Sequence, residues 1–164
     1  MIYFLSLLIS IIFIIGSVIL ISRIAKSLIL KERKAAMKHM EMFHLMNRWV
    51  EIKRDKHILA DYFNEKKIES IAIYGMNYIG NRLLKELSNT AIDVKYGIDV
   101  DVRLFYPDFR ILRFEDDFDV VDAVVVTPFL HFEEIKCKLR EKIDCPIINI
   151  EDILYEIEGV HDEL

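Results

Sequence analysis

Two glycines near the middle of the chain have the spacing of a phosphate-binding turn. The stretch reads Gly75-Met76-Asn77-Tyr78-Ile79-Gly80 and joins an apolar, β-branched segment to a segment with leucines at helical spacing. Gly75 lets the backbone turn through angles closed to other residues, and Gly80 allows a close contact between helix and strand. The free N–H groups and the dipole at the start of the following helix favour an anionic group such as a phosphate.

The turn differs from the dinucleotide-binding pattern at its middle position. That pattern is G-x-G-x-x-G, and Asn77 stands where the second glycine would let the backbone approach a pyrophosphate. Because asparagine tolerates a positive φ, we expect the turn to be kept, with a side chain that either bonds a ligand or blocks one. Met76 and Tyr78 flank it and are expected to line the same site. The sequence therefore predicts a Rossmann-type strand–turn–helix unit with an altered phosphate site.

Asp99 and Thr127 extend this candidate site to two further strands. Asp99 ends the next predicted strand, 19 residues after Gly80, where NAD-type sites place a carboxylate against the ribose hydroxyls. The alternative is that Asp99 only caps a turn. Thr127 follows the run VVDAVVV, and the carboxyl ends of parallel strands meet at one edge of a sheet. His131 is a further candidate at this rim, although a histidine there is more often a plain helix-start residue.

The remaining polar residues give little support for a metal site. Asp99 and Asp101 have the D-x-D spacing with which glycosyltransferases hold a metal, but the chain lacks the length of such a fold. Cys137 and Cys145 are the two cysteines, and without a CxxC motif or a Cys/His cluster they are typical of reduced thiols. The sequence predicts no metal ligands.

From Ile68 onward the periodicity predicts an α/β fold with a Rossmann-like parallel sheet of about five strands. Strands alternate with helices, which implies helices on both faces of the sheet, and VVDAVVV is typical of a central parallel strand. The acidic run Glu115–Asp117 is interpreted as the first turn of a short helix. The expected strands are 70–74, 93–99, 109–112, 122–127 and 147–150, and the expected helices are 78–87, 132–142 and one from 151, with a short turn near 115–119.

The first 22 residues predict a transmembrane helix. They carry no charge, and the apolar run Ile2–Ser22 would span about 31 Å as a helix, the thickness of a bilayer core. A cleaved signal peptide is the alternative, but the basic start and small-residue cleavage site that it needs are missing. Residues 23–38 hold six basic residues and one acidic residue, a local charge of +5. The positive-inside rule then puts the N-terminus outside and the C-terminal part in the cytoplasm, on a single-pass protein of the cell membrane.

Residues 23–66 are predicted to form a basic flank and a helical stalk, followed by the Rossmann-like domain at 67–164. Residues 17–74 contain neither glycine nor proline, so a helix could leave the membrane without a break. We expect an apolar face of this stalk to pack on the sheet or on a second copy, which makes a homodimer through the stalk a possible assembly. That face consists of Met42, Leu45, Met46, Trp49 and Val50. Because the net charge is −5, the rest of the chain carries −10, which argues against nucleic acid as a partner.

Between about Met40 and Glu156 the chain resembles a small Rossmann-like domain found in bacterial cell-surface polysaccharide loci. The resembling stretches are FHLMNRWVEIK, SIAIYGMNYIGNRLLKEL, VKYGID, VDAVVVTPF and CPIINIEDIL. Such domains occur fused to glycosyltransferases or beside sugar-modifying enzymes, so the resemblance implies this pathway and a glycosyltransferase partner. It also implies Gly75, Gly80 and Asp99 as binding positions, and it supplies no catalytic residue.

Three functions are compatible with these residues. The leading hypothesis is a membrane-anchored cytoplasmic accessory module that binds a nucleotide or nucleotide sugar in polysaccharide biosynthesis and has little or no activity of its own. The second is an NAD-dependent sugar oxidoreductase or epimerase, which would need a proton-transfer group beside the glycine turn, and none is evident. The third is a membrane scaffold whose Rossmann fold no longer binds a ligand. NAD and a nucleotide sugar both remain open as ligands.

Overall fold

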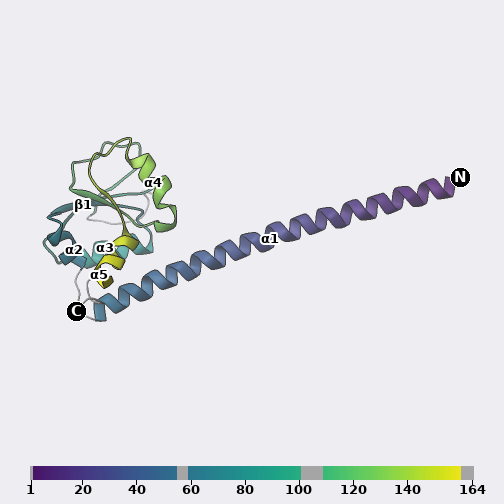
Figure 1. The fold of residues 1–164 in the computed structure, drawn as a ribbon. Helices are drawn as coiled ribbons and strands as arrows, with labels where there is room; N and C mark the ends of the chain where they lie inside the picture. Colours follow the sequence, from purple (N-terminus) through teal and green to yellow (C-terminus); the bar gives the residue numbers. More distant parts are fainter. Residues whose placement is uncertain (1, 55–58, 101–108, 160–164) are drawn as a thin grey trace. The chain divides into compact units, whose positions relative to one another are not determined.

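The structure is a computed structural model that describes residues 2–54, 59–100 and 109–159 (Figure 1). By its contacts the chain divides into two compact units, Met1–His44 and Leu45–Leu164. The helices are α1 (Ile2–Arg54), α2 (Leu59–Glu65), α3 (Tyr78–Leu87), α4 (Phe132–Leu139) and α5 (Ile150–Gly159), with a 3-10 turn η1 (Phe129–His131). The strands are β1 (Ser70–Tyr74), β2 (Asp93–Ile98), β3 (Ile111–Leu112), β4 (Ala123–Val126) and β5 (Ile147–Asn149).

The first unit is the N-terminal part of the single long helix α1. Its continuity follows from the sequence, because no glycine or proline interrupts α1 after Gly16. The stretch from Phe13 onward is long and apolar enough to cross a membrane, with a mean hydropathy of 2.0 in its best window, none of which is buried. This test rests on length and composition, and a signal sequence also passes it.

The second unit is built on a sheet of five parallel strands in the order β3-β2-β1-β4-β5. At the carboxyl ends of the strands, Tyr74 pairs with Ile98 on one side and with Val126 on the other. All four residues of β4 are buried, as the apolar run around them predicts for a central strand. The prediction of an α/β fold with about five parallel strands is confirmed.

Helices cover both faces of this sheet. On one face, Ile135 and Leu139 of α4 pack against strand residues that include Ala72 and Val124. Helix α3 contacts β1 and β2, α5 contacts β5, and α2 contacts both α3 and α5. Figure 1 shows α2, α3 and α5 lying together, apart from α4.

The last turns of α1 belong to the second unit. Leu45, Trp49 and Ile52 are buried there. The indole Nε1 of Trp49 donates to Glu86 Oε2 of α3 at 2.9 Å, and the Arg48 guanidinium lies 3.4 Å from the centroid of the Tyr155 ring of α5. The predicted apolar face therefore packs on helices of its own chain around Trp49. Val50 is the exception, since it is 54% exposed.

The prediction of a helix beginning at Glu115–Asp117 is wrong. This stretch forms a turn in which the Asp116 carboxylate accepts the Arg113 N–H at 2.7 Å. The ammonium group of Lys142 donates to the carbonyls of Phe114 and Asp116 at 2.7 and 2.8 Å. With these carbonyls bonded to a side chain, the short link to β4 takes no helical turn.

Candidate functional site

The turn after β1 requires glycine at both of its ends. Gly75 has a φ of +88°, and a Cβ there would lie 2.6 Å from Pro128 Cδ and 2.9 Å from Thr127 Oγ1. A Cβ at Gly80 would overlap the carbonyl oxygen of Gly75. The turn is therefore so tight that the first turn of α3 rests on the backbone that leads into it.

Asn77 caps helix α3 with its own side chain. Its Oδ1 accepts the backbone N–H groups of Ile79 at 2.8 Å and of Gly80 at 3.1 Å. Asn77 does not use the positive φ that asparagine tolerates, since its φ is −78° and its ψ is −167°. This extended backbone is the usual one for an N-cap, which turns the side-chain oxygen back onto the helix start. The two N–H groups that were expected to face a phosphate thus already have an acceptor.

Asp99 lies beside the same turn. Its Oδ2 accepts the Met76 N–H at 2.6 Å, and its own N–H donates to the Leu112 carbonyl of β3 at 3.0 Å. The Asp99 carboxylate therefore ties the end of β2 to the glycine turn. The sequence predicted that Asp99 lies near the glycine turn, either to bind a ribose or to cap a turn. The hydrogen bond from Met76 corresponds to the second of these roles.

Thr127 lies where the strand order changes direction. Strand β1 connects to β2 on one side and pairs with β4 on the other, so the crevice outside their carboxyl ends is the usual ligand position in an open α/β sheet. Thr127 is fully buried, and its hydroxyl donates to the Gly75 carbonyl at 2.6 Å. Its Oγ1 also lies 3.4 Å from Asn77 Oδ1. Three predicted site residues, Asn77, Asp99 and Thr127, thus converge on one turn.

Met76 and Tyr78 have opposite environments. The Met76 side chain is fully buried, and a Cβ at Gly97 would lie 2.7 Å from its Cγ and 2.8 Å from its Sδ. Gly97 therefore permits a close approach of the Met76 side chain to the backbone of β2. Tyr78 is 69% exposed at the start of α3 and presents an aromatic ring to solvent.

Tyr74 is a titratable group beside the turn that the sequence analysis missed. It is the last residue of β1 and is partly buried. Burial raises the pKa of its phenol; Lys138 acts against this, whereas Asp99 and Glu134 add to it. The phenol is therefore protonated at neutral pH and can donate a hydrogen bond but cannot serve as a base. Its position directly before Gly75 could have identified Tyr74 from the sequence as a residue beside the turn. His131 is exposed, and its backbone N–H closes the η1 turn onto the Pro128 carbonyl at 2.9 Å.

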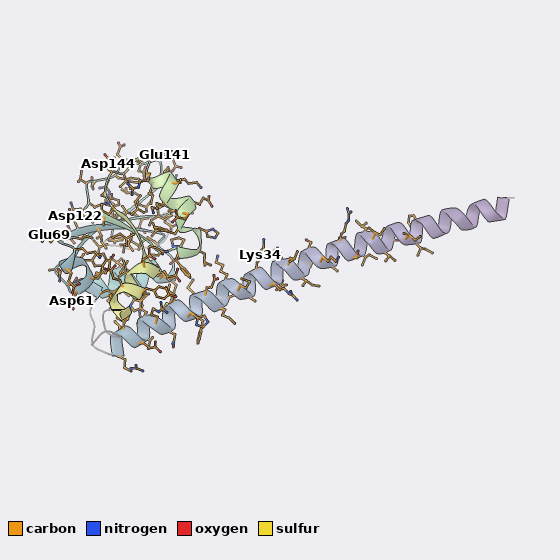
Figure 2. All side chains as sticks on the ribbon, in the orientation of Figure 1. Lys34, Asp61, Glu69, Asp122, Glu141 and Asp144 are labelled. Atoms are coloured by element: carbon orange, nitrogen blue, oxygen red, sulfur yellow. The ribbon has the colours of Figure 1, made fainter. Side chains whose placement is uncertain are left out.

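Acidic side chains mark the opposite edge of the sheet. Figure 2 labels Glu69, Asp122 and Asp144. Glu69 and Asp122 directly precede β1 and β4, and Asp144 lies shortly before β5. The Asp122 Oδ2 accepts the N–H groups of Glu69 and Ser70 at 3.0 and 2.7 Å and the Ser70 hydroxyl at 2.9 Å. These hydrogen bonds lower the pKa of Asp122. This carboxylate joins the starts of β1 and β4.

In the part of the chain that the structure describes, no three His, Cys, Asp or Glu side chains are grouped so that they could hold a metal ion. Asp101, the second acid of the D-x-D motif, lies outside the described residues.

No protein-family model matches this chain, and neither a curated protein nor a solved structure matches it. The functional assignment therefore rests on the geometry of the turn and on the physical character of α1.

Proposed function

We propose that this chain is a membrane-anchored, non-catalytic scaffold whose cytoplasmic domain has a Rossmann-like fold with a self-filled nucleotide crevice. The strand order β3-β2-β1-β4-β5 supports the fold, since it is the order of the first five strands of dinucleotide-binding domains. The apolar helix and the basic segment 23–38 support the anchor and the cytoplasmic side. The observation that carries the proposal is the hydrogen bonding of the Ile79 and Gly80 N–H groups to Asn77 Oδ1.

The self-filled crevice follows from what each group would do in a dinucleotide site. There the N–H groups at the helix start hold the pyrophosphate, and a carboxylate at the end of β2 holds the ribose. Here the Asn77 oxygen takes the place of a phosphate oxygen, and the Asp99 carboxylate binds the Met76 N–H. Met76 itself fills the space beside Gly97. A dinucleotide would have to displace all three, so the crevice serves the stability of the domain.

The role of such a scaffold is to hold an enzyme near the membrane. The resemblance to domains of polysaccharide loci supports a partner among the membrane enzymes of that pathway, with a glycosyltransferase as the first candidate. Cytoplasmic presentation is consistent with the side on which nucleotide sugars are available to such enzymes.

Binding of a nucleotide or nucleotide sugar is the second candidate, and one observation favours it. Asn77, Asp99 and Thr127 meet at the switch point of the sheet, beside the exposed Tyr78 ring. Displacing an N-cap costs only about 0.5–2 kcal/mol, whereas a micromolar ligand contributes about 8 kcal/mol. A ligand that supplied its own acceptor to the helix start could therefore replace the Asn77 side chain.

Calorimetry on the full-length protein in detergent separates the two candidates. The ligands are NAD, CoA and a UDP-sugar at millimolar concentration, applied to wild type, Asn77→Gly and Asn77→Asp. The scaffold proposal expects no binding to wild type and a gain of dinucleotide binding in Asn77→Gly, because the glycine frees the helix-start N–H groups and leaves only Asp99 and Met76 to be displaced. Asn77→Asp keeps the cap and adds a negative charge, so it should gain nothing. Asn89→Gly, at an exposed asparagine after α3, is the matched control.

Binding of any of these ligands to wild type would contradict the scaffold and establish the second candidate. Ligand binding would also raise the stability of the protein, since a ligand at a hundred times its dissociation constant adds about 2.7 kcal/mol to the free energy of unfolding.

A further inference from the structure

The basic side chains of residues 23–38 gather on one side of helix α1. At about 100° per residue, all six fall within an arc of about 160°. They are Arg23, Lys26, Lys31, Arg33, Lys34 and Lys38, and each is exposed. Segregation of this kind is not needed to fix membrane orientation, which depends on the number of basic residues near the span.

The other side of the same stretch forms a mainly apolar seam, in which Glu32 is the single charged residue. Its members follow one another at steps of three or four residues, so they share one face of the helix. Met40 and Phe43 are 63% and 67% exposed. The seam consists of Ala25, Ile29, Glu32, Ala36, Met40 and Phe43. In the sequence the same spacing continues through Asn47 and Val50, both of which are exposed.

We propose that this seam binds the same seam of a second copy of the chain, in parallel orientation. The charge distribution selects this occupant. Two 23–38 segments that each carry +5 repel one another if they meet through most faces, but contact through the seam leaves the cations other than Arg33 facing outward. Apolar residues at such spacing are what parallel helix pairs bury, and an asparagine at such a position, as Asn47 is in the continuation of the seam, is a known determinant of register in them.

The membrane anchor of the proposed function, on which this inference rests, fixes the orientation. Two copies inserted in the same direction present their seams in parallel and at equal depth, and confinement to the bilayer raises their effective concentration. Glu32, the single acidic residue of 23–38, lies at one flank of the seam, and Arg33 lies at the other. In a parallel pair opposite flanks meet, so Glu32 of one copy faces Arg33 of the second copy.

A lipid surface explains the charge distribution less well. Along a straight helix, Lys38 lies about 24 Å beyond Ser22, and this exceeds the screening length of about 8 Å at physiological salt. The cations near the end of the segment would therefore gain little from anionic headgroups while α1 remains a continuous helix. The seam, in contrast, runs the full length of the segment.

Cysteine cross-linking in membranes tests the pairing. Cys137 and Cys145 are first replaced by serine, and Ala36→Cys is compared with Ala35→Cys, the neighbouring alanine about 100° around the helix. A disulfide needs Cα atoms within about 7 Å, so mild oxidation should give several-fold more covalent dimer for Ala36→Cys than for Ala35→Cys. Ala36→Arg, which puts a cation into the seam, should convert the uncross-linked protein to a monomer in detergent, and Ala35→Arg should not.

Equal cross-linking at both alanines, or a monomer in wild type, would overturn the proposal. A cross-link from Ala36→Cys to a different protein would overturn the proposal in favour of a heterologous partner. Protection of the Ala36→Cys thiol from oxidation that depends on anionic vesicles would overturn it in favour of lipid. Retention in the membrane pellet after a high-salt wash is scored in the same samples. Loss from the pellet defeats the proposed anchor, whereas monomer in the pellet defeats the pairing alone.

Discussion

The polar side chains around the glycine turn are bonded to the backbone of the turn itself. Asn77 holds the start of α3, Asp99 holds the Met76 N–H, and Thr127 holds the Gly75 carbonyl. Each side chain satisfies the hydrogen bonding of a backbone group in the turn. Hydrogen bonds to a charged carboxylate are the stronger kind. Residue types that bind nucleotides in related architectures can thus serve to close a turn.

Gly80→Ala tests how tightly the turn is closed. The added methyl group would overlap the Gly75 carbonyl oxygen, so the backbone must shift. We expect the free energy of unfolding to fall by about 1–3 kcal/mol, as in other overpacked sites. Trp49 is the single tryptophan of the chain and is buried in the second unit, so its fluorescence during urea unfolding gives the measurement. Gly159→Ala is the control, since nothing lies within 4 Å of its Cβ; an equal effect at both glycines would contradict the contact.

Asp122 gives the domain a pH dependence at acid pH. Its pKa is held below the ordinary value of 3.8 by hydrogen bonds from Ser70 and Glu69. A carboxyl with a lowered folded-state pKa contributes stability that is present above its unfolded pKa and is lost as the pH falls through the folded pKa. The difference in stability between wild type and Asp122→Asn should therefore be constant at neutral pH and shrink as the pH falls below 3.8.

Ser70→Ala is the companion to this variant. It removes the hydroxyl donor at 2.9 Å and leaves the two backbone donors to Asp122, so it should weaken the acid dependence without abolishing it. Urea titrations at a series of pH values measure both variants. A stability difference that grows toward acid pH would show that the hydrogen bonds do not favour the charged carboxylate.

At the scale of elements, the last turns of α1 act as part of the domain core. The Trp49 ring is fully buried, and its Nε1 bonds the Glu86 carboxylate, which also pairs with Lys53 at 3.1 Å. The Glu86 side chain is only 7% exposed. A nearly buried carboxylate needs such partners, because desolvation without them is costly. The junction between α1 and α3 is therefore fixed by both packing and charge.

Trp49→Ala should lower the free energy of unfolding of this unit by about 3–5 kcal/mol, the usual cost of deleting a large aromatic side chain from a core. Far-UV circular dichroism follows the unfolding, because the variant has no tryptophan. Trp49→Phe keeps an aromatic ring but loses the donor to Glu86, so its loss should be smaller. Val50→Ala, at the exposed neighbour, should change stability by less than about 0.5 kcal/mol. Similar losses for Trp49→Ala and Val50→Ala would place Trp49 outside the core.

How much could be predicted from the sequence depended on whether a signal was local. β1 and α3 have the predicted limits, 70–74 and 78–87, because the glycine turn separates them and apolar spacing marks each of them. β3 keeps only Ile111–Leu112 of a predicted 109–112, since an edge strand ends where its neighbour stops pairing. The convergence of Asn77, Asp99 and Thr127 followed from parallel topology. The hydrogen-bond partners of these residues could not be predicted in the same way. Whether Asn77 faces a ligand or its own helix depends on a side-chain rotation that spacing does not encode.

At the scale of the molecule, charge is distributed along the chain in a way that bears on its placement. Residues 1–22 are uncharged, 23–38 carry +5, and the rest carries −10. A basic segment next to an apolar helix resists translocation, whereas acidic residues contribute little to orientation. The acidic domain is also repelled by anionic lipid, so it should remain soluble beside the membrane to which α1 would attach it.

The orientation of the chain is the last prediction. We expect the protein to remain in the membrane fraction after a high-salt wash, because an apolar helix of about 20 residues is held by the hydrophobic effect and not by charge. A C-terminal alkaline phosphatase fusion should be inactive, since that enzyme needs the oxidising periplasm and we expect the basic segment to keep the C-terminus in the cytoplasm. Replacing all six basic residues of 23–38 by glutamine should raise the activity of the fusion, while replacing the same number of acidic residues of the domain should not. A strongly active wild-type fusion would place the domain on the outer side and remove the basis for a cytoplasmic partner.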